Sequence, residues 1–104
     1  MQEITPQEFK NLRDSKLDFQ LIDVREPFEV EIVTLGGEPI PMGEILDNLD
    51  RINKNKQVIV YCKSGKRSGT IVQMLEQHGF GNVFNLKGGI LAYAEAIDKS
   101  LTKY

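Results

Sequence analysis

The chain has 104 residues, of which 40% are hydrophobic and 27% are charged, and its net charge is −2 at pH 7. This size and composition indicate one soluble globular domain over residues 1–104. The small negative charge gives no bulk attraction to nucleic acid or anionic membranes, and no apolar run reaches the roughly 20 residues that a membrane helix needs. Any anion-binding site must therefore be local.

The first ten residues are polar and show no secretory signal, and the chain has one cysteine. A single cysteine cannot form an internal disulfide, so we expect a reducing, cytoplasmic location. One cysteine and one histidine also cannot supply the ligands of a structural zinc site. We therefore expect no metal.

The first predicted element is a helix that begins at Thr5 and ends near residue 15. Thr5 has the character of an N-cap, Pro6 suits the first helical position, and Glu8 completes a capping box. Phe9 and Leu12 are spaced to face a core.

Further along the chain, short apolar strands alternate with helical segments. The strands are expected at 19–24, briefly around Ile40, and at 58–62 and 82–86. The helices are expected at 26–33, 43–52, 68–80 and 87–98, and the tail from Lys99 onward is expected to fray. Gly79 is the expected C-cap of helix 68–80.

This alternation predicts an α/β domain with a mostly parallel central sheet of about five strands and helices on both faces. Strands 19–24 and 58–62 are apolar without alternation, which is typical of strands buried on both faces. The residues that follow such strands lie at the carboxyl edge of the sheet, where open α/β folds bind ligands.

The segment after strand 58–62, CKSGKRSGT, places the only cysteine at this edge. Gly65 allows a tight turn that presents amide protons inward, and the following helix contributes the positive end of its dipole. A thiol in this position is expected to be partly ionised. The sequence therefore predicts a reactive thiolate at Cys62.

Three cations, Lys63, Lys66 and Arg67, surround this cysteine. Cations near a helix N-terminus oppose the dipole by about 0.3–1 kcal/mol each, so the cluster indicates that an anion sits among them. The alternative is that the three side chains simply point into solvent.

Histidine is the usual activator of a cysteine nucleophile, but the only histidine, His78, follows Ser68 by ten residues on one helix. At the α-helical rise this is roughly 15 Å, so His78 cannot act on Cys62. Papain-like hydrolysis is therefore excluded.

Three segments, LIDVREPFEVEI, VIVYCKSGKRSGTIVQML and NVFNLKGGILAYAEAID, together resemble a single-domain rhodanese. They cover most of the chain in the family order, although the usual GHIPGA segment is replaced by EIVTLGGEPIP and Tyr93 replaces a frequent tryptophan. The chain is also similar to rhodanese domains fused behind adenylating enzymes that supply sulfur carriers.

The resemblance implies that Cys62 accepts sulfane sulfur as a persulfide. It further implies that the following loop cradles the persulfide and an anionic donor such as thiosulfate, without any cofactor. The residues of this loop are Lys63, Ser64, Gly65, Lys66, Arg67 and Ser68.

Asp23 and Arg25 lie at the end of strand 19–24, on the same sheet edge as Cys62, and are expected to support the loop. Asp23 would pair with a loop cation or with loop amides, and Arg25 would help to attract the donor. The alternative for Asp23 is local bonding to the backbone at a strand end. Ser64 and Ser68 would bond the sulfur or, for Ser68, cap the helix.

Related Cys-Arg phosphatases and arsenate reductases place five residues between cysteine and arginine, whereas four lie between Cys62 and Arg67. The shorter loop favours sulfur over phosphate. Three hypotheses remain: a thiosulfate sulfurtransferase, a persulfide carrier that serves a protein donor or acceptor with little turnover, and a redox-sensing thiol or inactive scaffold.

Overall fold

A computed structural model describes all 104 residues, and its centre is a five-stranded sheet with the order β1-β5-β4-β2-β3. All four strand pairs are parallel. The strands are β1 (Glu3–Ile4), β2 (Phe19–Asp23), β3 (Glu38–Pro39), β4 (Gln57–Tyr61) and β5 (Val83–Leu86). The predicted α/β class with a parallel sheet is confirmed.

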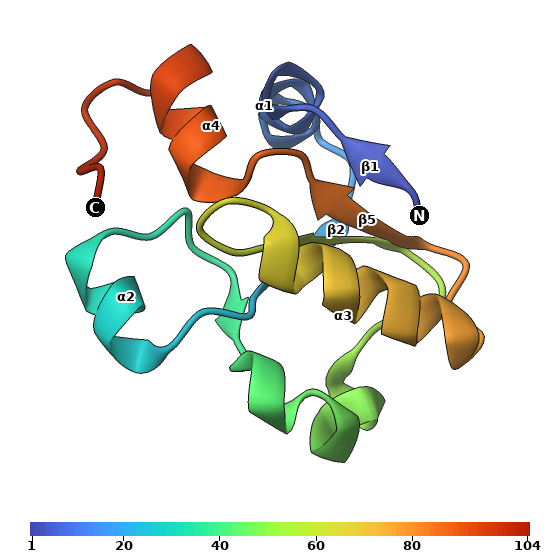
Figure 1. Cartoon of the computed structure of the whole chain (residues 1–104). Helices are drawn as coiled ribbons and strands as arrows, with labels where there is room; N and C mark the ends of the chain where they lie inside the picture. The colour runs from blue at the N-terminus through green and yellow to red at the C-terminus, as the bar shows by residue number, and fades with distance from the viewer.

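Helices cover both faces of this sheet, as expected (Figure 1). The α-helices are α1 (Pro6–Asp14), α2 (Pro27–Ile32), α3 (Lys66–Gln77) and α4 (Gly89–Ala96). Helices α1 and α4 lie side by side on one face, and α3 lies on the other, while α2 stands beyond the sheet edge near the C-terminus (Figure 1). Two short 3₁₀ helices, η1 (Met42–Glu44) and η2 (Leu46–Arg51), share the face of α3.

The sheet divides the buried apolar side chains into two clusters. The inward residues of α3, namely Ile71, Val72 and Leu75, pack with Val58 and Val60 of β4 on one side. Phe9 of α1 belongs to the second cluster on the other side. Burying a side chain of this kind contributes about 1.5–3 kcal/mol, so both layers anchor the sheet whose carboxyl edge carries the cysteine.

The helix predicted at 43–52 is wrong, because the chain forms η1 and η2 there, with a non-helical Asn48 that kinks η2. The Asn48 side chain donates a hydrogen bond to the Glu44 carbonyl at 2.7 Å. That carbonyl is the acceptor that an α-helix would have given to the Asn48 amide, so side-chain competition interrupts the helix. Ile45 and Ile52 are buried all the same.

Both ends of the chain depart from expectation. The two-residue strand β1 is not signalled by the sequence; it pairs with β5 through Glu3 and Ile4. The expected fraying of the tail is wrong, because Leu101 and Tyr104 pack against the cluster that contains Phe9. The last residues of the chain lie beside α2 and α4 (Figure 1).

Candidate active site

Cys62 directly follows β4 and is 1% exposed. The amide of Gly65 donates to its Sγ at 3.1 Å, the amide of Ser68 at 3.4 Å, and the Ser68 hydroxyl lies 3.3 Å from the same sulfur. Helix α3 begins at Lys66, two residues before the predicted start. Its N-terminal end therefore faces the sulfur, where the helix dipole favours negative charge.

Gly65 makes this turn possible, because its φ of 95° lies in the left-handed region that glycine adopts without strain. The residue is the N-cap of α3, and its position brings both its own amide and that of Ser68 to one atom. The sequence-based expectation of an inward-facing loop amide is thus met in the geometry.

A second glycine turn closes the site from the α4 side. Gly88 and Gly89 have φ values of 77° and 65°, and they bring the first amides of α4 onto the start of the cysteine loop. The Ile90 amide donates to the Cys62 carbonyl at 2.9 Å, and the Leu91 amide donates to the Lys63 carbonyl at 3.1 Å. The backbone on both sides of the cysteine is therefore fixed by α4.

Replacing Gly89 by alanine is expected to displace the cysteine loop. A Cβ at this position would lie 2.4 Å from the Lys63 carbonyl oxygen and 2.6 Å from that of Cys62, and the positive φ alone costs about 1–2 kcal/mol. We expect lower stability in urea unfolding and slower reaction of Cys62 with sulfur donors. Gly81→Ala is the control, because nothing lies within 4 Å of its added Cβ; equal behaviour of the two variants would contradict the prediction.

The three loop cations have different surroundings. Arg67 donates to both oxygens of Glu29, at 2.7 and 2.9 Å. The Lys63 ammonium lies 4.5 Å from the centre of the Tyr104 ring, and Lys66 is exposed. For Arg67, the protein itself supplies the anion that the sequence led us to expect, namely the Glu29 carboxylate. Only Lys63 and Lys66 are left to attract an anion from outside.

Arg25 is fully buried, and all five of its guanidinium N–H groups find acceptors. It donates twice to Asp23, at 3.0 and 2.8 Å, and also to the carbonyls of Glu29 and Val33 and to the Tyr104 hydroxyl. The prediction that Arg25 attracts an anionic donor is wrong, because no N–H group remains for a ligand.

Asp23 is 1% exposed and pairs with Arg25 rather than with a loop cation, so that prediction is also wrong. Its Oδ1 also accepts the backbone amide of Arg25 at 3.0 Å, which is the local backbone bonding considered as the alternative. Asp23 and Arg25 form a buried pair beneath α2 and do not touch the sulfur.

Glu29, in α2, was not identified from the sequence, although it connects three parts of the site. It accepts from Arg67, from the Glu26 amide and from the Tyr104 hydroxyl. The bonds from Arg67 are the main reason that the pKa of this carboxyl falls from 4.5 to about 2. The signal in the sequence was the spacing from Glu26 to Glu29 around Pro27, which is typical of a helix start.

The pair of Glu29 and Arg67 predicts a specific acid sensitivity. Because the pKa of Glu29 is depressed by folding, its contribution to stability is complete above pH 4.5 and is lost as the pH falls toward about 2. Its part of the pH slope is at most about 1.4 kcal/mol per pH unit, and solvent near Arg67 reduces it. The free energy of unfolding of Glu29→Gln, measured in urea at several pH values, should fall less steeply between pH 4.5 and 2 than that of the wild-type protein. Parallel pH dependences of the two proteins would contradict the assignment.

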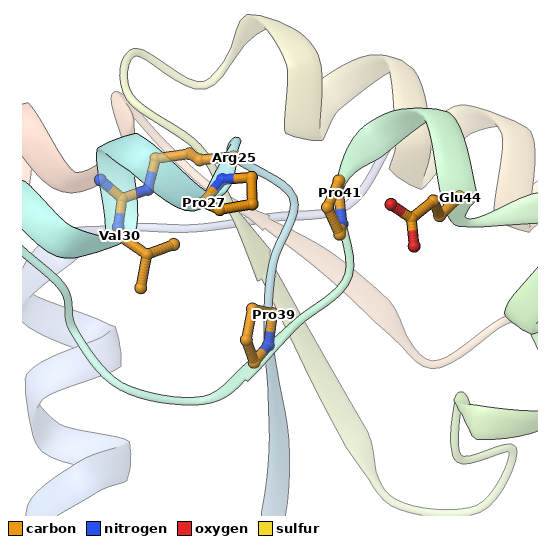
Figure 2. A pocket seen from close by; sticks show the side chains of 6 residues that line it. All are labelled: Arg25, Pro27, Val30, Pro39, Pro41 and Glu44. Carbon is orange, nitrogen blue, oxygen red and sulfur yellow. The ribbon is translucent and has the colours of Figure 1, made fainter.

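Neither cavity of the structure is lined by Cys62. One, of about 360 Å³, lies on the far side of Arg25 between α2, β3 and η1, and Figure 2 shows the side chains around it. The donors around Cys62 therefore form a small nest at one atom rather than a pocket. No three metal-binding side chains come together in the structure, and none of its helices has the length and apolar character of a membrane span.

Comparison with known proteins identifies the family. The sequence model of the rhodanese-like domain matches residues 5–96, so the chain belongs to the rhodanese-like domain family. It is 38% identical over 78 residues to a protein of Allochromatium vinosum named sulfurtransferase, covering 74% of this chain and 73% of that one. The crystal structure of a rhodanese-like domain protein from Staphylococcus aureus superposes with a TM-score of 0.83 at 35% identity, covering 89% and 91% of the two chains.

Other relatives are much longer than this chain. It is 40% identical over 90 residues to rhodanese-like/PpiC domain-containing protein 12 of Arabidopsis thaliana, covering 82% of this chain but 30% of that protein. It is 31% identical over 104 residues to the probable adenylyltransferase/sulfurtransferase MoeZ of Mycobacterium tuberculosis, covering 97% of this chain and 26% of MoeZ. The chain therefore corresponds to one part of these proteins.

Proposed function

We propose that this chain transfers sulfane sulfur as a persulfide on Cys62, from thiosulfate or a similar donor to a thiophilic acceptor. The observation that carries the proposal is the pair of backbone amides, those of Gly65 and Ser68, that donate to one sulfur atom at the N-terminal end of α3. Membership of the rhodanese-like family and the sulfurtransferase relative support it. The lone cysteine suits a reducing compartment such as the cytoplasm.

In the first half-reaction, the Cys62 thiolate attacks the outer sulfur of thiosulfate. The sulfur–sulfur bond of thiosulfate breaks, sulfite leaves with its electron pair, and the enzyme retains a cysteine persulfide anion. In the second half-reaction, a nucleophile such as cyanide or a thiol takes the outer sulfur and restores the thiolate. The Gly65 and Ser68 amides and the helix end stabilise negative sulfur throughout, which is electrostatic preorganisation.

Within this proposal Lys63 and Lys66 attract the anionic donor, and Ser64, which is exposed, lines the loop without a bond to the sulfur. Arg67 has a different role, because its bidentate pairing with Glu29 holds the loop against α2. A Cys-Arg phosphatase needs a free guanidinium for the phosphate oxygens. The engagement of Arg67 therefore argues against phosphate chemistry.

A persulfide carrier is the second candidate. Cys62 is 1% exposed and lines neither cavity, so a donor must approach the sulfur end-on. In addition, Arg25 and Arg67 are paired with carboxylates, so few cations are free to hold a small oxyanion. A protein persulfide, with one terminal sulfur, suits this approach as well as thiosulfate does. The lengths of the relatives show that such domains occur beside other domains.

Intact-mass spectrometry after thiosulfate treatment tests the proposal. We expect the wild-type protein to gain the mass of one sulfur atom, and cyanide to remove that mass with release of thiocyanate. A protein that gains the mass from a cysteine desulfurase but not from thiosulfate would be a carrier. Rapid oxidation of Cys62 by peroxide with no gain from either donor would contradict sulfur transfer and indicate a redox sensor.

A further inference from the structure

Asn85 is a buried polar residue beside the candidate site that the sulfur-transfer proposal does not use. It lies on β5 opposite Val60 of β4 and is 2% exposed. Its side chain bonds both ends of the turn around the sulfur: Nδ2 donates to the Gly65 carbonyl at 3.1 Å, and Oδ1 accepts from the Ser68 hydroxyl at 2.5 Å. These are two of the residues that contact Cys62 Sγ.

The orientation of the Asn85 amide decides where the Ser68 proton lies. The Gly65 carbonyl can only accept, so the amide nitrogen must face it and Oδ1 must face Ser68. An amide oxygen cannot donate, so the Ser68 hydroxyl must give its single proton to Asn85 while that bond exists. In this arrangement the hydroxyl offers only its lone pairs to Cys62.

We propose that Asn85 is a positioning residue that competes with the Cys62 sulfur for the proton of Ser68. While Ser68 donates to Asn85, its oxygen accepts from the neutral thiol of Cys62 and favours that form. When Cys62 carries a negative charge, the Ser68 hydroxyl rotates to donate to the sulfur, and Asn85 Oδ1 loses its partner. The bond between Ser68 and Asn85 therefore opposes negative charge on the Cys62 sulfur.

This inference rests on the proposed role of Cys62, but it can be measured without any sulfur transfer. Cys62 is the only cysteine, so the ultraviolet absorbance of its thiolate can be titrated in the intact protein. The Cys62→Ser variant supplies the tyrosine background for subtraction. If the Asn85 substitutions shift the titration but the protein transfers no sulfur, only the proposed sulfur transfer is contradicted.

The test compares Asn85→Leu and Asn85→Ala with the wild-type protein. Both variants free the Ser68 hydroxyl for the thiolate, so the midpoint of the titration should move to lower pH. The expected gain in the thiolate-to-thiol ratio at fixed pH is about two- to tenfold, the effect of one hydrogen bond. In a Ser68→Ala background the same substitutions should leave the midpoint where it is.

Two comparisons separate this role from a merely structural one. Asn82→Ala removes another asparagine with two side-chain hydrogen bonds, in this case to the Asn53 and Lys56 carbonyls, but it should not move the midpoint. Asn85→Asp keeps the size and the acceptor for Ser68 and adds a negative charge, which disfavours a second negative charge on the sulfur. Its midpoint should therefore move to higher pH, opposite to the larger changes. An unmoved midpoint in the Asn85 variants, or an equal shift with and without Ser68, would overturn the proposal.

Discussion

The Cys62→Ser variant should gain no mass from thiosulfate and should produce no thiocyanate from cyanide. A serine hydroxyl fits the same position and can accept from the Gly65 and Ser68 amides, so the fold should be retained. The hydroxyl stays protonated, however, because no general base contacts it. A neutral hydroxyl does not attack a sulfane sulfur, so the whole cycle stops at its first step.

His78→Ala is the matched control, because histidine is the residue that commonly activates a cysteine. The His78 ring is exposed and bonds the Met74 carbonyl at the end of α3, the opposite end from Cys62. We expect this variant to accept and release sulfur at the wild-type rate. Sulfur transfer that survives in Cys62→Ser, or that disappears in His78→Ala, would show that the reactive group is misassigned.

The α/β class and the position of the cysteine were predictable because they depend on local patterns. Continuous apolar strands predicted β2 and β4, and Gly65 followed by a helical pattern predicted a turn with inward amides. The capping box of Thr5 and Glu8 was also confirmed, since each side chain bonds the other's amide. Such signals need only a few neighbouring residues.

The partners of the charged residues could not be predicted in the same way. Arg67 finds Glu29 across 38 positions of sequence, and Arg25 finds Tyr104 across 79. These contacts depend on the approach of α2 and the C-terminal residues, which no local pattern fixes. Asn85 was overlooked for a related reason. A polar residue in a strand is normally predicted to be exposed, and only the packing of α3 against β5 shows that Asn85 is buried.

The largest loss of stability is expected from Arg25→Met. Removing the guanidinium leaves the Asp23 carboxylate buried without its ionic partner, and it deprives the Glu29 and Val33 carbonyls of a donor. Breaking a buried ion pair in this way costs about 3–5 kcal/mol. Urea unfolding at neutral pH should show this loss as a lower midpoint with an unchanged slope.

Arg51→Met is the matched control, because Arg51 pairs with Glu38 on the surface and such pairs contribute at most about 1 kcal/mol. The double variant Arg25→Met with Asp23→Asn should recover part of the loss, because the buried charge is then absent. Equal effects of the two arginine substitutions would contradict the buried pair. Folded Arg25→Met should still bind thiosulfate like the wild-type protein, because Arg25 has no free N–H group for the anion. Weakened binding would instead support the sequence-based expectation that Arg25 attracts the donor.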